Sequence, residues 1–508
     1  MKENSRTYNT IVNSLWGVLA SIVTTILNFV VRVVLVKTLG EEINGIHNLF
    51  QSIITVMTLM EIGLNTAMII HLYAPIKEQK NDLIKGIIGF YRRLYRILSI
   101  IFFIVGLLLS FTVLDGMITS SIPISMIRIY FLLFVLSFSL GYLTNYRRCI
   151  IFAEQKNRIS ILATTISELI FRSMQIITLF VYHNYLIFLL LSILERLCNN
   201  GICNYYVIKR YPFLRYLKEY DIEKNIKEAI FKTVRPLFVN QLSNTVQMSS
   251  RSILISILLG NVSIVGYFGN YQLIMSVIQL IYSQFGGAFT SSFGNLRVDA
   301  SPEKLRSVYF KSAFVMNWVA TICCSCFICC SDIFIYLVFG ENFVLETINV
   351  VILTISLVIF LFNIPIISVQ NALGLHNLDA TFMVIQAIVA IILEFVLGTF
   401  WGMKGIFLGL LIPLVVFTFI CKGVLISKCS LAMSSSKYLK FISKELCKVL
   451  FTVFISYGIC KTYIGNYSIL SLILSFITAV VISVILPLSL SFRQPEMKAV
   501  SSIFIKLK

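Results

Sequence analysis

Residues 21–63 decide the fold, and they read SIVTTILNFVVRVVLVKTLGEEINGIHNLFQSIITVMTLMEIG. The apolar periodicity predicts two long helices joined by a short turn that glycines bound. Glu61 lies well inside the second helix. Polar residues recur at helical spacing along one face of the first helix, which ends in a cation. These residues are Ser21, Thr25, Asn28 and Arg32.

The composition assigns the whole chain to membrane proteins. Of its 508 residues, 58% are apolar and 13% are charged, and the mean hydropathy is +0.89. Soluble domains have about 25% charged residues. Apolar runs long enough to cross a bilayer recur from Ile11 onward, so the sequence predicts an all-α polytopic membrane protein. The first run is too long for a signal peptide and lacks a small-residue cleavage site, so we expect it to be retained.

The apolar runs and the charges between them predict about fourteen transmembrane helices. The spans are 11–36, 44–73, 94–114, 123–145, 159–181, 185–207, 234–258, 262–290, 308–331, 347–372, 379–399, 403–426, 446–464 and 468–491. Of the 42 Lys and Arg, 34 fall on the side of the N-terminus and three on the other, at Lys37, Lys404 and Lys461. This asymmetry predicts that both termini are cytoplasmic. It also explains the net charge of +19 without nucleic acid as a partner, because the cations orient the chain and contact anionic membrane lipids.

The pattern of the first two spans returns in the seventh and eighth. The offsets of the first polar face recur in Asn240, Asn244, Gln247 and Arg251. Each arginine precedes a glycine, Gly40 or Gly260, and the helices that follow carry polar stripes beginning at Gln51 and Gln272. Six spans separate the copies, so both enter the membrane in the same direction. We therefore expect two pseudo-symmetric six-helix lobes with a site between them.

This repeat sets the expected domain boundaries. Residues 1–210 form an N-terminal lobe (spans 1–6), and residues 211–233 form an amphipathic linker on the cytoplasmic surface. Residues 234–428 form a C-terminal lobe (spans 7–12). Residues 429–508 hold two additional C-terminal helices (spans 13–14) and a cytoplasmic tail.

Arg32 and Arg251 are the main candidates for an anion site. They occupy equivalent depths in the outer half of their spans. Two cations that face one cavity repel each other, so an anion between them is the natural complement. The alternative is that each side chain extends to the outer headgroups.

The fifth and sixth spans form a tight hairpin around His183. Counted outward from the turn, Glu168 matches Arg196 in depth and Arg172 matches Glu195. Two crossed ion pairs would offset the cost of burying these charges and need no function. The alternative is that Arg172 and Arg196 bind an anionic substrate.

Two acidic residues have no evident partner nearby in the sequence. Glu61 and Glu394 lie inside predicted spans, and a buried carboxyl group can carry a proton. They are therefore the candidates for ion coupling. No Cys/His spacing resembles a metal site, and no nucleotide or catalytic motif occurs, so we expect no metal, no cofactor and no enzyme activity.

The motifs resemble a known family. LVKTLGEEINGIHNLFQSI (35–53) and MEIGLNTAMIIHLYAPI (60–76) are similar to the start of bacterial Wzx-type flippases. These are the O-antigen and capsule repeat-unit transporters of the multidrug/oligosaccharidyl-lipid/polysaccharide (MOP) superfamily. FAEQKNRIS (152–160) and QNALGLHNLDATF (370–382) resemble its recurrent cytoplasmic junctions. The likeness extends over nearly the whole chain.

The resemblance implies a function. It implies that undecaprenyl-pyrophosphate-linked oligosaccharide moves from the inner to the outer leaflet of the bacterial cytoplasmic membrane, through a cationic central cavity and by alternating access. The arginines would bind pyrophosphate, and the polar stripes would hydrogen-bond sugar or phosphate. Transport would be driven by a proton or sodium gradient, or by the substrate's own gradient. We expect a monomer that associates with polysaccharide assembly proteins.

The sequence leaves three alternative functions. A lipid II flippase of the same superfamily is hard to separate by sequence. A drug/cation antiporter would carry a cationic substrate, which favours buried carboxylates over the several buried arginines seen here. A membrane polysaccharide polymerase or ligase would need a large outer loop, and the predicted outer loops are short.

Overall fold

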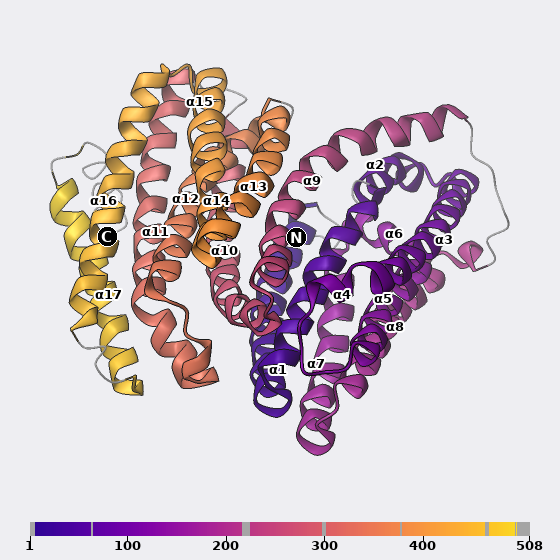
Figure 1. The fold of residues 1–508 in the computed structure, drawn as a ribbon. Helices are drawn as coiled ribbons and strands as arrows, with labels where there is room; N and C mark the ends of the chain where they lie inside the picture. Colours follow the sequence, from indigo (N-terminus) through magenta and orange to yellow (C-terminus); the bar gives the residue numbers. More distant parts are fainter. Residues whose placement is uncertain are drawn as a thin grey trace. The chain divides into compact units, whose positions relative to one another are not determined.

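The computed structural model describes residues 6–61, 64–215, 224–296, 301–375, 378–462, 467–492 and 494. These residues form helices and connecting turns, without any strand among them (Figure 1). Contacts divide the chain into two compact units, Met1–Gly266 and Tyr267–Lys508. The predicted lobe boundaries remain predictions. Part of the predicted linker lies outside the described residues, and its last ten residues belong to a long helix that begins at Lys224.

Eleven helices in the described part of the chain are long and apolar enough to cross a membrane. The prediction of an all-α polytopic membrane protein is therefore confirmed, whereas the number of fourteen spans remains a prediction. The three other predicted spans are 44–73, 234–258 and 446–464. The first is interrupted at Thr58–Glu61. Within the second, the described residues include a shorter apolar helical stretch, Ser249–Leu259. The third lies in a helix with charges at Lys444, Glu445, Lys448 and Lys461.

The first unit is a bundle of helices around α1. Helix α7 contacts α1 and α8, α5 contacts α3 and α8, and α9 contacts α1 and α2. Its elements are α1 (Arg6–Met57), the 3-10 turn η1 (Thr58–Glu61), α2 (Leu64–Lys77), α3 (Asn81–Thr112), α4 (Leu114–Met117), α5 (Ile124–Asn145), α6 (Arg148–Ala153), α7 (Asn157–Tyr182), α8 (Tyr185–Arg210), η2 (Pro212–Leu214), α9 (Lys224–Leu259) and the start of α10 (Val262–Leu296).

Helix α1 bends sharply at Gly40, where φ is 85°. Arg32 Nη2 donates to the Gly266 carbonyl at 3.5 Å, and Gly45 packs against the same short segment of α10. In a straight helix Arg32 and Gly45 would lie about 20 Å apart, so the chain turns back between them. Gly260, its counterpart in the predicted repeat, also has a positive φ, of 59°. Both turns use the conformation that glycine adopts without steric cost.

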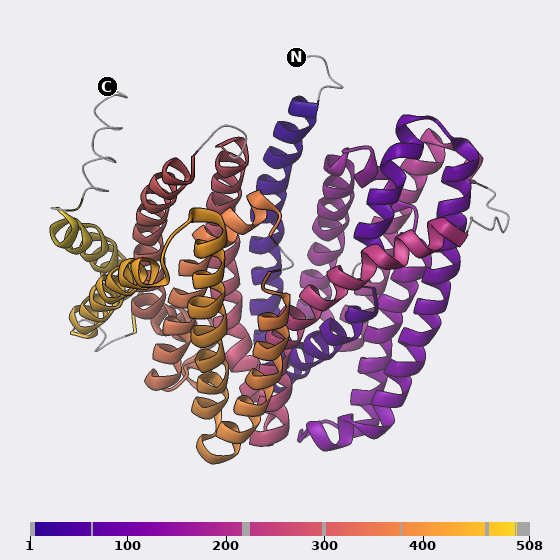
Figure 2. The ribbon, with the colours of Figure 1, turned by 90° about the horizontal axis from the view of Figure 1, so that it is seen from above.

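The second unit is built around α11, which contacts α12, α16 and α17. Figure 2 shows α16 and α17 side by side. Besides the rest of α10, its elements are α11 (Pro302–Phe339), η3 (Glu341–Phe343), α12 (Thr347–Leu373), α13 (Ala380–Trp401), α14 (Met403–Pro413), the π-helical segment η4 (Leu414–Lys422), α15 (Gly423–Leu431), α16 (Ser435–Lys461) and α17 (Ile469–Ser491).

A buried ion pair ties three elements of the second unit together. Lys422 Nζ, at the end of η4, lies 2.7 Å from the Asp379 carboxylate that precedes α13. Gln370 of α12 donates to the other Asp379 oxygen at 2.7 Å. Both charges are almost fully buried, and each has a partner, as buried ions require.

Candidate functional site

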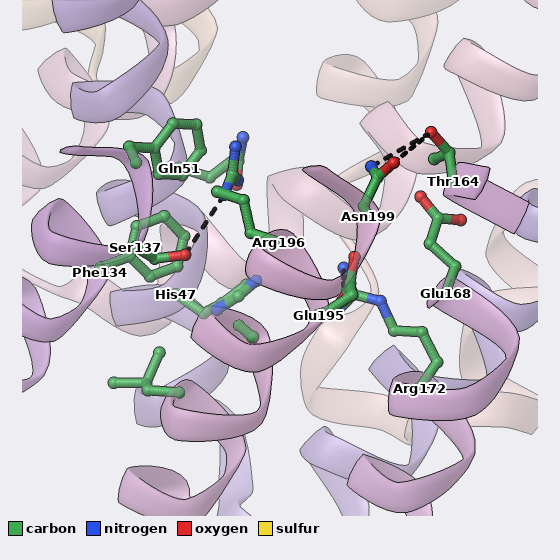
Figure 3. A pocket seen from close by; sticks show the side chains of 13 residues that line it. His47, Gln51, Phe134, Ser137, Thr164, Glu168, Arg172, Glu195, Arg196 and Asn199 are labelled. Atoms are coloured by element: carbon green, nitrogen blue, oxygen red, sulfur yellow. Dashed lines mark hydrogen bonds and ion pairs between the residues drawn. The ribbon is translucent and has the colours of Figure 1, made fainter. Parts of the chain in front are cut away.

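A polar cavity of about 320 Å³ lies inside the first unit, enclosed by α1, α5, α7 and α8. In Figure 3, His47, Gln51, Phe134, Ser137 and Arg196 lie on one side, and Thr164, Glu168, Arg172 and Asn199 lie on the other. On α5, α7 and α8, the polar lining residues lie seven or more residues from the helix ends. At 1.5 Å per residue this is about 10 Å from either end, so the cavity is deep within the bundle.

The hairpin of α7 and α8 positions much of the lining. It turns at His183, whose φ of 49° ends α7, and the Asn184 side chain accepts a hydrogen bond from Leu186 N at 2.8 Å and caps α8. Within the hairpin, Arg172 lies 3.4 Å from Glu195, as the depth argument predicts. Arg172 also donates to Gln175 Oε1 at 2.9 Å. The Arg172 charge is thus already compensated by the protein.

The second predicted pair, between Glu168 and Arg196, does not form. Arg196 Nε donates to Ser137 Oγ of α5 at 3.3 Å, and its guanidinium carbon lies 3.8 Å from the centre of the Phe138 ring. Consecutive helical residues point in different directions, so Glu195 faces α7 while Arg196 faces α5. Helical rise determines the depth of Arg196 but not its direction around the helix.

Glu168 remains in the cavity without this partner. Its Oε2 atom is buried and has no hydrogen-bond donor within the described residues. Glu168 lies one turn from both Thr164 and Arg172 on the same face of α7, and all three line the cavity. The cavity therefore has a carboxylate oxygen that can accept a hydrogen bond from a ligand.

Several lining residues were missed from sequence. His47 lies beside Gln51 on α1, and its Nδ1 shares a hydrogen bond of 3.0 Å with the Tyr185 hydroxyl. Thr164 and Asn199 hydrogen-bond to each other across the hairpin, at 3.2 Å from Asn199 Nδ2 to Thr164 Oγ1. A signal was available, because His47 is one turn before Gln51, and Thr164, Glu168 and Arg172 follow the same helical spacing.

Glu61 lies at the 3-10 turn that interrupts the second predicted span. The Tyr95 hydroxyl donates to its Oε1 at 2.7 Å, and Tyr95 packs edge-on against Tyr142. Glu61 does not line the cavity itself.

The other predicted site residues lie elsewhere. Arg32 is half-buried on α1, with Thr25 half-buried and Asn28 exposed on the same helix. Gln247 and Arg251 are buried one turn apart on α9, which packs against α1. The side chains of Asn240 and Asn244 are outside what the structure describes. The structure thus brings Arg172 and Arg196 into one cavity, and neither Arg32 nor Arg251 lines it.

Glu394 belongs to the second unit. It is fully buried on α13 at the contact with α14, where Gly409 packs directly on its backbone. Because Gly409 has no side chain, α14 can approach α13 closely at Glu394. A role of Glu394 in coupling remains a prediction.

Comparison with solved structures finds this fold in transporters. An inward-facing multidrug resistance MATE family transporter of the MOP superfamily matches with a TM-score of 0.67 at 14% identity, over 83% of this chain and 96% of its own. The lipid II flippase MurJ, in an inward closed conformation, gives 0.67 at 16% identity, over 95% and 99%. A MOP superfamily transporter from Pyrococcus furiosus gives 0.57 at 13% identity, over 87% and 96%. The chain therefore has the fold of these MOP-superfamily structures.

Comparison with family profiles identifies the family of this chain. The profile of the family described as polysaccharide biosynthesis protein matches residues 11–292, more than half of the 508 residues, and the chain belongs to this family. No curated protein sequence matches significantly. The prediction of a MOP-superfamily fold is confirmed, and the Wzx-type assignment remains a prediction.

Proposed function

We propose that this protein is a flippase that moves undecaprenyl-pyrophosphate-linked oligosaccharide repeat units from the inner to the outer leaflet of a bacterial cytoplasmic membrane. The observation that carries the proposal is a charged, hydrogen-bonding cavity inside the helices of a polysaccharide biosynthesis family member. An apolar lipid tail needs no such cavity, whereas a glycan headgroup must be shielded from hydrocarbon while it crosses.

In this proposal the pyrophosphate binds at Arg32 and Arg251. Both cations lie on helices that pack together, and each precedes a glycine turn of positive φ. Cations at such positions in a membrane protein are costly and are retained for a function. Arginine also matches the planar, two-oxygen geometry of a phosphate group. Alternating access between the two leaflets, driven by a proton or sodium gradient, completes the mechanism.

The test is transport by the purified protein in liposomes. Fluorescently labelled lipid-linked oligosaccharide would become accessible to a membrane-impermeant reagent faster than in protein-free liposomes. A wild-type rate equal to the protein-free rate would overturn the proposal. Transport of a cationic dye or of lipid II instead would favour the drug antiporter or the lipid II flippase.

A variant makes the test specific. Arg251→Ala is expected to lower the transport rate by about ten- to a hundredfold, because a charge-assisted hydrogen bond contributes about 1.5–3 kcal/mol. Arg251→Lys keeps the charge and should retain part of the rate. Arg128→Ala is the matched control, because Arg128 pairs with Asp115 at the end of its helix, at 2.6 Å. Equal rates for Arg251→Ala and wild type would exclude Arg251 from the anion site.

A further inference from the structure

The charges of the cavity in the first unit balance. Two guanidinium groups, of Arg172 and Arg196, line it together with two carboxylates, of Glu168 and Glu195. Arg172 is paired with Glu195, and Arg196 already uses Nε on Ser137 and one face of its guanidinium on Phe138. A pyrophosphate placed here would be repelled by two carboxylates about as strongly as it is attracted by the two arginines.

The hydrogen-bonding groups point to a ligand that donates as well as accepts. Glu168 Oε2 is buried and has no donor within the described part of the chain, so its complement is a donor. An ionised pyrophosphate has only acceptor oxygens, whereas a sugar hydroxyl donates and accepts. Thr164, Ser192 and Asn199 add groups of both kinds on the same two helices.

The size and the apolar wall agree with this chemistry. About 320 Å³ is at the lower end of the range for small-ligand sites, so the cavity accommodates a group of sugar size. Phe134 provides an apolar surface on the α5 side, beside Phe138, whose ring lies against the Arg196 guanidinium. The carbon–hydrogen face of a sugar ring can pack on such a surface while its hydroxyls face the polar wall.

We infer that this cavity is a subsite for an uncharged sugar residue of the oligosaccharide, separate from the site that binds the pyrophosphate. The inference rests on the proposed flippase function and assigns the glycan to the bundle of α1, α5, α7 and α8. Glu168 is the residue expected to determine specificity, by accepting a hydrogen bond from a sugar hydroxyl. A site built to bind a hydroxyl discriminates strongly against a ligand that lacks it.

The experiment measures binding of two probes to the full-length protein in nanodiscs by calorimetric titration. One probe is the free oligosaccharide that mild acid releases from the lipid-linked pool of the expressing bacterium, and the other is inorganic pyrophosphate. Glu168→Gln is expected to weaken oligosaccharide binding about tenfold, since it removes a charged acceptor, and to leave pyrophosphate binding within about twofold. Arg251→Ala is expected to do the reverse.

The controls separate this inference from a folding defect. Asp82→Asn removes an exposed carboxylate that pairs with Lys85, and it should change neither titration. Glu168→Asp keeps the charge and should recover part of the affinity if the acceptor matters. Each variant is used only if its melting temperature is within a few degrees of wild type.

Three results would overturn the inference. The first is that wild-type protein does not bind the free oligosaccharide. The second is that Glu168→Gln binds it as wild type does. The third is that Glu168→Gln binds pyrophosphate more tightly, because relief of repulsion would place the phosphate in the cavity. Failure of the proposed function is separate, since the protein would then bind the oligosaccharide but not transport the lipid-linked form.

Discussion

At the scale of single residues, Glu61 combines a titratable group with a break in a helix. It ends the 3-10 turn between α1 and α2 and accepts a hydrogen bond from Tyr95. Short 3-10 segments inside longer helices often mark functional hinges. A change in the charge of Glu61 would therefore act directly at this turn.

We predict that Glu61→Gln uncouples transport from the ion gradient. Glutamine keeps the size and the acceptor oxygen for Tyr95 but cannot bind and release a proton. Imposed proton or sodium gradients should accelerate wild-type transport in liposomes and leave the rate of the variant unchanged. Tyr95→Phe is the control, since it removes the hydrogen bond and keeps the carboxyl group. A variant that still responds to the gradient would count against Glu61.

The charged residues of the hairpin show what sequence can predict about a site. Helical rise and the position of the turn were sufficient to match Arg172 with Glu195, and the structure confirms that pair. The same reasoning gave a wrong pair for Glu168 and Arg196, because it used depth and not direction. The direction of Arg196 depends on α5, which supplies Ser137 and Phe138, and no local pattern indicates which helix will be the neighbour.

At the scale of elements, the contact of α13 with α14 depends on small residues. Gly405 and Gly409 lie one turn apart on α14 and let its backbone approach α13. A Cβ on Gly409 would overlap the backbone of Glu394, and one on Gly405 would overlap the Leu397 carbonyl. Closely packed helices in membranes rely on small residues at such spacing.

We predict that Gly409→Ala lowers the stability of the protein by about 1–3 kcal/mol, because the added methyl group meets rigid backbone. Gly458→Ala on α16 is the matched control, since its Cβ would meet no atom within 4 Å. This control should be neutral or slightly stabilising, because alanine favours helix over glycine by about 0.5–1 kcal/mol. Thermal unfolding in detergent measures both, and equal melting temperatures would contradict the packing argument.

Element boundaries were predictable where a turn residue marks them. The turns at Gly40, His183 and Gly260 fall where glycine or a short polar segment interrupts an apolar run, and all three have positive φ. The π-helical segment Leu414–Lys422 lies between Pro413 and Gly423, but both have helical φ, so no turn marks its ends. It ends at Lys422, which pairs with Asp379, so a tertiary contact accompanies this departure from the α-helix.

At the scale of the whole molecule, contacts within each unit join loops that the charge distribution assigns to the same side of the membrane. In the first unit, Glu42 accepts a hydrogen bond from Ser121 N at 3.0 Å, and both lie in predicted outer loops. In the second, Glu346 pairs with Lys404 at 2.8 Å, again between predicted outer loops. On the opposite side, the Tyr211 hydroxyl donates to Glu154 at 2.8 Å. These contacts support the predicted topology independently of hydropathy.

A reporter experiment tests the prediction that α9 and α16 cross the membrane. We predict that alkaline phosphatase fused after residue 260 or 467 is active outside, and that green fluorescent protein fused after residue 215 or 434 fluoresces inside. The physical reason is the excess of lysine and arginine on the predicted inner side, since translocating these cations is unfavourable.

Fusions after residues 119 and 183 serve as outer references. If residues 434 and 467 report the same side, α16 does not span and the count of fourteen is wrong. If residues 215 and 260 report the same side, α9 does not span the membrane. The two repeats would then not be parallel, and Arg32 and Arg251 would not lie at equal depth.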